Sequence, residues 1–188
     1  MIPRKYLVHY IKVPEDPKEA FEESNGTVYN KYVWVRIGQH LEAFAEELNP
    51  QTNIVQNIWG YQSVVHNGYQ VQSAVDTFYA TSDTTDNDYY LYKYVEYLAL
   101  HRSTGDNCKT ERVEALINID GIENASNSDP VPVDWAWKED CYVTPQSLGG
   151  DTSGFQIPFQ ISNLGNRREV EISKNQQGQI LVTEIDND

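Results

Sequence analysis

Alternating residues that favour extended backbone constrain this chain more than any other feature of its sequence. Val, Ile, Thr, Phe, Tyr and Trp make up 63 of the 188 residues. β-Branched and aromatic side chains fit a pleated, half-buried surface better than they fit a helix. Residues 29–37 show the pattern best, with Val33, Val35 and Ile37 on one face of an extended segment. We therefore expect a mainly β protein.

The same alternation indicates further strands, separated by polar or turn-forming residues. They span residues 6–12, 54–65, 69–79, 110–119, 135–144, 155–162, 168–173 and 179–185. Asn67-Gly68 predicts a hairpin turn, because a type I′ turn needs two residues with positive φ. Residues 42–48 fit either a strand or a helical turn that Asn49-Pro50 ends. Pro158 suggests an edge strand or a bulge.

One segment has helical rather than extended periodicity. Apolar residues recur at three- and four-residue steps after Tyr90, and the expected helix spans about residues 88–102. Asp86 or Asp88 is the expected N-cap, and Gly105 closes the helix. Nearer the N-terminus, two prolines and five acids within residues 13–24 indicate a loop or one short helical turn.

The strands and the helix together predict one antiparallel β domain that forms a barrel or a sandwich. Residues 1–28 are expected to form an N-terminal arm or strand plus an acidic loop, and residues 29–188 the single β domain. Gly149 and Gly150 are expected to make a turn with positive φ. The expected core and inter-strand residues are Val33, Val35, Ile37, Val113, Leu116, Phe155, Ile157 and Ile161.

The charge of the chain excludes some partners. Lys and Arg number 14 and Asp and Glu 28, which gives a formal net charge of −14. Nucleic-acid binding needs a positive surface that releases counterions, so the sign is wrong for it. No apolar run approaches the roughly 18 residues of a membrane span. Residues 1–13 alternate and carry charge, unlike a signal peptide, so synthesis and folding in a cytoplasm is the expectation.

No motif predicts catalysis, and we expect no enzyme, no cofactor and no catalytic or metal-binding residues. His9, His40, His66 and His101 lack the spacing of a metal site. The acidic pairs Glu22-Glu23, Glu46-Glu47 and Asp186 with Asp188 are interpreted as solvated surface. The glycine-rich residues 147–154 lack the lysine of a phosphate-binding loop and lead into a strand.

Cysteine and tryptophan leave alternatives open. Cys108 and Cys141 are expected to be reduced thiols, although a bridge between them is compatible with the sequence. Trp34, Trp59, Trp135 and Trp137, with thirteen tyrosines, suit either carbohydrate binding or a protein–protein interface. Composition does not separate these two uses.

Four stretches, taken in order, resemble the tail tube (major tail) proteins of long-tailed bacteriophages. The chain order is an opening strand, an Asn-Pro-x-Thr turn, a single helix followed by a strand, and a glycine-glycine turn between two strands. The stretches are residues 33–38 (VWVRIG), 46–52 (EELNPQT), the helix with residues 109–119, and residues 136–140, 147–151 and 155–165. The resemblance covers roughly residues 30–175, and residues 1–28 are longer than the family pattern.

The resemblance implies two packed antiparallel sheets with one flanking helix, as in the related tube proteins of contractile tails and type VI secretion. It implies a homo-oligomer of stacked six-membered rings through which DNA leaves the capsid, with tape-measure and tail-terminator proteins as partners. It places the protein in the virion tail, after assembly in the host cytoplasm. Residues 1–28, residues 49–68 and the C-terminal strand are then the interface candidates.

Elementary physics agrees with such a role. An acidic bore repels phosphates and lets a duplex slide. Unpaired strand edges favour aggregation of a lone subunit, and a ring pairs them. The alternatives are a stand-alone β-sandwich binding module for carbohydrate or protein, and another tail component such as a terminator or a baseplate hub domain. These tail components share the fold, so the fold alone does not separate them.

Overall fold

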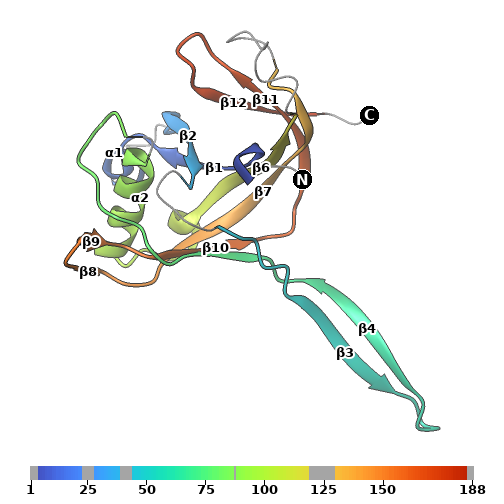
Figure 1. The fold of residues 1–188 in the computed structure, drawn as a ribbon. Coiled ribbons are helices and arrows are strands. Elements are labelled where there is room, and N and C mark those ends of the chain that lie inside the picture. Colours follow the sequence, from blue (N-terminus) through green and yellow to red (C-terminus); the bar gives the residue numbers. More distant parts are fainter. Residues whose placement is uncertain (1–3, 23–27, 39–43, 87, 119–129, 186–188) are drawn as a thin grey trace.

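The computed structural model describes residues 4–22, 28–38, 44–86, 88–118 and 130–185. The protein is mainly β with antiparallel sheets and few helices, as expected (Figure 1). An eight-stranded sheet follows the order β12-β11-β7-β6-β1-β2, with β10 also paired to β7 and β5 paired to β10. Among the described residues this sheet does not close into a barrel.

The strands of the main sheet are β1 (Leu7–Pro14), β2 (Tyr32–Ile37), β5 (Gln72–Val75), β6 (Lys109–Ile117), β7 (Val133–Pro145), β10 (Phe159–Asn163), β11 (Arg168–Lys174) and β12 (Ile180–Glu184). Two separate hairpins are formed by β3 (Pro50–Gln56) with β4 (Gln62–Tyr69), and by β8 (Gly149–Asp151) with β9 (Gly154–Gln156). The 3-10 turns η1 (Arg4–Tyr6) and η2 (Gly105–Cys108) precede β1 and β6.

The sheet branches because β7 is longer than its partners. β6 pairs with almost all of β7 on one side. On the other side, β11 pairs with β7 at Trp137 and Lys138, and β10 pairs with it from Cys141 to Pro145. Residues on β7 therefore connect two parts of the molecule that carry separate buried clusters.

The first buried cluster lies between the sheet and α2 (Tyr89–Leu100). Its helix residues Leu91, Val95 and Leu98 pack in the same cluster as Cys141 and Val143 of β7. The Tyr94 hydroxyl, also buried there, donates to the Asn107 carbonyl oxygen at 3.1 Å. The helix thus occupies the segment that sequence periodicity predicts, and it covers one face of the sheet.

The second cluster uses the other face of the same strands. Val8 and Tyr10 of β1 belong to it, whereas Ile11 and Val13 belong to the first cluster. Alternate residues of a strand point to opposite faces, so β1 contributes to both. The remaining buried members are Val113, Ala115, Ala136, Val170 and Ile172. Residues 7–14, which lie in the segment expected as an arm or a strand, form a strand between β2 and β6.

The residues before β2 contain the short helical turn that was one of the two expectations. Helix α1 (Pro17–Phe21) begins after Asp16, whose Oδ1 accepts from the Lys18 and Glu19 N–H groups at 2.9 and 3.3 Å. At α2, the N-cap position is Asp88, and its N–H donates to the Asp86 carboxylate at 2.9 Å. Both aspartates named from the sequence therefore lie at the helix start.

Most expected core residues are buried, and one expectation is wrong. Val35, Ile37, Val113, Ile157 and Ile161 are buried, while Val33 and Leu116 are half-buried. Phe155 is instead 42% exposed on β9. The expected strand at residues 155–162 is divided into β9 and β10 around Pro158, which has no N–H to donate to a ladder. Phe155 therefore lies in the exposed β8–β9 hairpin, whereas Ile157 and Ile161 are buried in the core.

The predicted hairpin turn at Asn67-Gly68 is also wrong. These residues lie inside β4, beside a register shift between Gln51 and Thr52. The turn falls within the segment expected as one continuous strand. There the Asn57 Oδ1 accepts from the N–H groups of Trp59 and Tyr61, each at 3.0 Å. This local capping bends the chain without needing an Asn-Gly pair.

Gly149 and Gly150 do not have positive φ, contrary to expectation, since both lie in β8. The positive φ belongs to Gly154, on the other side of that turn. Gly150 is required for a different reason. A Cβ atom there would lie 2.3 Å from the Gly154 carbonyl oxygen, so the close approach of β8 and β9 excludes a side chain.

Candidate functional site

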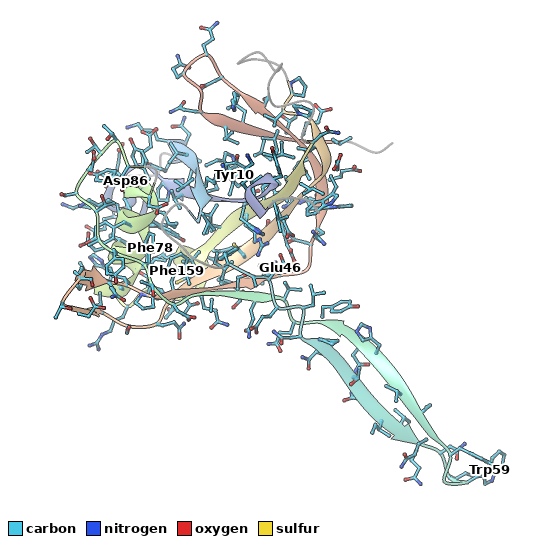
Figure 2. The ribbon with its side chains drawn as sticks, in the orientation of Figure 1. Tyr10, Glu46, Trp59, Phe78, Asp86 and Phe159 are labelled. Atoms are coloured by element: carbon cyan, nitrogen blue, oxygen red, sulfur yellow. The ribbon has the colours of Figure 1, made fainter. Side chains whose placement is uncertain are left out.

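The hairpin formed by β3 and β4 projects from the body of the molecule (Figure 1). All seven residues of β3 are exposed, and on β4 only Gly68 is half-buried. Figure 2 shows Trp59 at the far end of the hairpin, away from the body that holds Phe78 and Phe159. An isolated two-stranded hairpin is marginally stable at best in water.

The hairpin has an unusual composition for an exposed segment. Residues 48–75 contain no Asp, Glu, Lys or Arg, in a chain of which 22% is charged. At the tip, Ile58 is 95%, Trp59 79% and Tyr61 72% exposed. Ile54, Val55, Val64, Val65 and Tyr69 are the exposed apolar residues of its two strands. An apolar surface of this extent marks an interaction site.

Hydrogen bonds fix the root of the hairpin. Glu47 and Gln72 exchange two backbone hydrogen bonds, at 2.8 and 3.1 Å. Asn49 has a φ of 39°, and its carbonyl oxygen accepts from the Gln70 N–H at 3.2 Å. Just before this point, the Phe44 ring is buried and lies edge-on to His9 at 4.7 Å. The exposed hairpin therefore has an ordered base.

A buried ion pair holds the same base against β6. The Arg112 Nη2 lies 2.5 Å from the Glu46 Oε2, and their side chains are only 4% and 12% exposed. The Arg112 Nη1 also donates to the Asn163 Oδ1 at 3.3 Å. The expectation that Glu46 belongs to a solvated acidic surface is therefore wrong. Breaking a buried pair by removing one partner is strongly destabilising.

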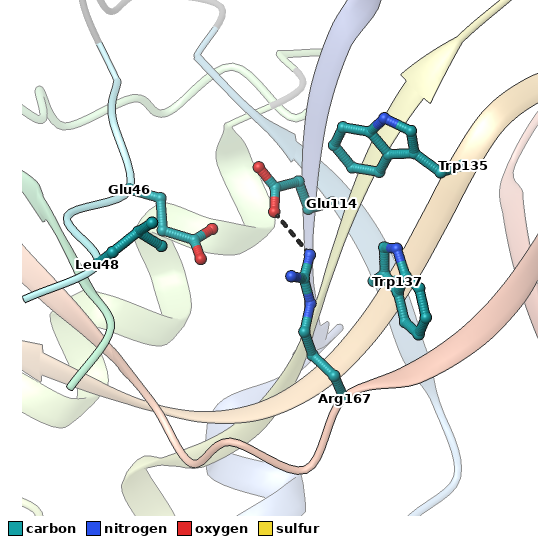
Figure 3. Close-up of a pocket in the computed structure, with 6 residues that line it drawn as sticks. All are labelled: Glu46, Leu48, Glu114, Trp135, Trp137 and Arg167. Atoms are coloured by element: carbon teal, nitrogen blue, oxygen red, sulfur yellow. Dashed lines mark hydrogen bonds and ion pairs between the residues drawn. The ribbon is translucent and has the colours of Figure 1, made fainter. Parts of the chain in front are cut away.

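Next to this pair is a groove of about 500 Å³ (Figure 3). It is lined by Glu46, Leu48, Glu114, Trp135, Trp137 and Arg167. Trp137 lies opposite Glu114 in the β6–β7 register. Trp135, two residues earlier on β7, lies on the same face of the strand. Strand pairing therefore creates the groove floor, and the residues before β3 form its wall.

Charges in the groove are balanced and closely paired. The Arg167 guanidinium lies 5.3 Å from the Trp137 ring centroid, and its Nη2 donates to the Glu114 Oε2 at 3.3 Å. Burial, and then the neighbouring Glu46 carboxylate, raise the pKa of Glu114 to about 7, although Arg112 and Arg167 oppose the shift. The two glutamates thus share two arginines, and the pKa of Glu114 lies near neutral pH.

Other charged residues form a network on the opposite face of the sheet. Glu111 accepts from Lys12 at 2.7 Å and from Lys138 at 3.0 Å. Burial alone would raise the pKa of Glu111, but the two lysines outweigh it and lower that pKa. Arg168 likewise pairs with Asp140 at 2.8 Å. Each of these charged groups therefore lies in an ion pair with a group of opposite charge.

The histidines that the structure describes lie on separate elements, whereas Cys108 and Cys141 lie in the same buried cluster. His9 is buried in β1, His66 is on the exposed β4, and His101 follows α2, where it lies 3.3 Å from Glu22. Cys108 and Cys141 are buried and free, and burial raises the pKa of Cys141 to about 12.

Four of the residues noted from the sequence lie outside the described ranges, namely Glu23, His40, Asp186 and Asp188. Within those ranges, no three His, Cys, Asp or Glu residues are grouped as for a metal ion. None of the helices described is both long and apolar enough to cross a membrane.

The four tryptophans divide into three environments. Trp34 packs against the second buried cluster, Trp59 is at the hairpin tip, and Trp135 with Trp137 lines the groove. Sequence reasoning missed Arg112, Glu114 and Arg167. No local signal marks them, because Glu46 and Arg112 are 66 residues apart and meet only through strand pairing.

No protein-family model matches the chain, and no curated protein matches it. Two solved structures are similar to it in outline, both from an extracellular contractile injection system, PVC. One is the sheath–tube complex in the extended state, with a TM-score of 0.43 and 8% identity over 98% of this chain and 93% of that chain. The other is the sheath/tube terminator in the extended state, with a TM-score of 0.44 and 9% identity over 89% of this chain and 94% of that chain. At these values neither likeness bears on function, which is inferred below from the chain's own surfaces.

Proposed function

We propose that the chain is a structural subunit of a bacteriophage tail tube that assembles with copies of itself. In this role the subunits form stacked six-membered rings around a conduit for DNA, with tape-measure and tail-terminator proteins as partners. The protein would be assembled in the host cytoplasm and reside in the virion tail. The role requires neither catalysis nor a cofactor.

The observation that carries the proposal is the projecting hairpin. Eight large apolar side chains are exposed on a two-stranded element whose residues are almost all exposed. Such an element gains stability by burying that surface against a partner. An interface of standard size buries about 800 Å² per partner, and the aromatic tip alone offers two side chains of roughly 150–250 Å² each.

The ends of the main sheet offer a second kind of contact. Among the strands that the structure describes, β2 and β12 are each hydrogen-bonded to a neighbouring strand on one side only. Unpaired N–H and C=O groups of an edge strand are a template for pairing with another chain. Contacts between different surfaces of identical chains close into a ring or continue as a filament, according to the rotation between them.

Charge supports the conduit. All 28 acidic residues lie outside residues 48–75, so the net charge of −14 belongs to the body of the molecule. A bore formed by such bodies repels phosphate groups and favours the passage of a duplex over its binding.

The test is assembly of the purified protein over a concentration series, followed by light scattering and negative-stain electron microscopy. A shortened variant replaces residues 53–65 with Asn-Gly, which is suited to a two-residue turn between Thr52 and His66. Wild type is expected to form rings and tubes, and the shortened variant to remain monomeric with its body folded. Leu100→Gln, at a residue that is 62% exposed on α2, is the matched control and should assemble. A wild-type chain that stays monomeric at every concentration would reject the proposal.

The tryptophan-lined groove favours one competing function, a stand-alone carbohydrate-binding module. That function predicts a monomer that binds oligosaccharides through Trp135 and loses them on Trp135→Ala with the fold retained. Rings that never stack into tubes would instead favour a terminator or a baseplate component.

A further inference from the structure

The groove lined by Trp135, Trp137 and Arg167 is a preformed cup that the ring and the bore do not by themselves explain. Its floor is the β6–β7 ladder, and its wall contains Leu48, which is 53% exposed. Figure 3 shows the two indole rings one above the other, with Arg167 alongside Trp137 and with Glu46 and Leu48 on the opposite side.

The lining indicates the kind of group that would enter. Glu46 pairs with Arg112, and Glu114 pairs with Arg167, so the groove holds no unmatched charge for an ionic ligand. The remaining lining is aromatic or aliphatic. Tryptophan and arginine around a central pocket are typical of the few interface residues that carry most of the binding energy. An uncharged, largely apolar group fits such a cup best.

The protein itself displays such a group. The hairpin tip holds Ile58, Trp59 and Tyr61, the middle of a 28-residue stretch without a charged side chain. Trp and Tyr also carry a polar N–H or O–H that the groove carboxylates are able to accept.

We propose that the groove is the receptor for the β3–β4 hairpin tip of a second copy of this chain, with Trp59 packed against Trp135 and Trp137. The proposal rests on the self-assembly proposed above and specifies its contact.

Geometry makes this contact intermolecular. Leu48 lies two residues before β3, so the groove is at the root of the hairpin, whereas Trp59 is at its far end (Figure 2). Ten residues of extended chain separate Pro50 from Gly60, which is roughly 33 Å. A chain therefore cannot place its own tip in its own groove. Tip and groove are different surfaces, so each copy both inserts a tip and receives one, and the contact propagates from copy to copy.

Two exposed positions allow each half of the contact to be removed without disturbing the core. Trp59→Ala removes the inserted ring, and Leu48→Gln makes the groove wall polar. Each is expected to raise the concentration for half-assembly at least about tenfold, the loss typical of a central interface residue. Leu100→Gln is the matched control for Leu48→Gln, and circular dichroism and urea unfolding check that every variant is folded.

Mixing the two variants gives the decisive result. Trp59→Ala keeps an intact groove, and Leu48→Gln keeps an intact tip, so an equimolar mixture still allows one contact per pair. We expect sedimentation velocity to show a heterodimer in the mixture, at concentrations where each variant alone is monomeric.

The outcomes separate this inference from the proposed function. If wild type assembles and Leu48→Gln assembles equally well, the groove is not the receptor, although self-assembly stands. If the mixture shows no heterodimer, the tip-to-groove pairing is wrong. If wild type itself does not assemble, the proposed function fails first and this contact fails with it.

Discussion

The body of this protein buries its apolar side chains, whereas its β3–β4 hairpin exposes them. The body encloses two buried clusters on the two faces of shared strands, and its charges are paired across the sheet. The hairpin carries apolar residues of the same kinds, such as Ile54 and Val64, but leaves them in solvent. The comparison teaches that the body buries its apolar core within one chain, whereas the hairpin lacks the surface that would cover its apolar side chains.

The largest expected effect of this contrast is on stability after truncating apolar side chains. Phe159→Ala, at a residue that is only 1% exposed and lies edge-on to Phe78, should lower the free energy of unfolding by about 3–5 kcal/mol. Ile54→Ala, at a residue 70% exposed on β3, should change it by less than about 0.5 kcal/mol. Urea unfolding of dilute protein measures both values. Comparable losses at the two positions would show that the hairpin is part of the folded core.

The second prediction concerns the ion pair at the boundary between the two regions. Arg112→Ala leaves the Glu46 carboxylate buried without its nearest cation and should cost about 3–5 kcal/mol. Lys31→Ala breaks the exposed pair with Glu19, and because solvent screens that pair it should leave the free energy of unfolding nearly unchanged. The same unfolding experiment compares them. If Arg112→Ala were as mild as Lys31→Ala, the hairpin base would not depend on this pair.

A smaller effect is expected in the pH dependence of stability. Because the folded protein raises the pKa of Glu114 from 4.5 to about 7, the protonated carboxyl stabilises the fold. That stability is fully present below the unfolded pKa of 4.5 and is lost as the pH rises through about 7. Glu114→Gln should therefore remove about 1–2 kcal/mol of the fall in unfolding free energy between pH 5 and pH 8.

The surroundings of Glu114 define the control for this measurement. The Glu114→Gln variant leaves the surrounding groups unchanged, namely Glu46, Arg112, Arg167 and the cross-strand neighbour of Glu114, His9. Glu171→Gln removes an exposed carboxylate of β11 instead and serves as the matched substitution. Identical pH profiles for wild type and Glu114→Gln would contradict a raised pKa of Glu114 in the folded protein.

The smallest effect is expected with DNA. An acidic body and an uncharged hairpin provide no set of cations to release counterions from a duplex. We expect no shift of double-stranded DNA in a gel at about 50 mM salt, in the range where such binding is strong. A salt-dependent shift would contradict the view of the bore as a non-binding conduit.

Sequence periodicity predicted the elements whose pattern follows from local packing. α2, β2 and β6 lie where their spacing placed them, because each buries one regular face or stripe. The hairpin turn was missed because Ile58 and Trp59 continue the apolar pattern of a strand, whereas the polar Asn67-Gly68 imitates a turn. Sequence patterns assign apolar residues to buried elements, so they do not predict an exposed apolar tip.

The groove shows the other limit of such reasoning. Trp135 and Trp137 were noted as aromatic residues, but the other groove residues come from three separate parts of the chain. Glu46 was interpreted as solvated, and only the β1–β6–β7 register and the fixed hairpin base bring it to Arg112. Sites assembled by long-range strand pairing carry no local spacing that would reveal them.

Amide hydrogen exchange at two protein concentrations tests the central claim most directly, since it reports on the body and the hairpin in one experiment. We predict that β6 and β7 are protected at both concentrations, whereas β3 and β4 exchange rapidly in dilute protein and become protected when copies assemble. Hairpin amides that are equally protected at both concentrations, or that stay unprotected in an assembled sample, would contradict a hairpin completed by another copy.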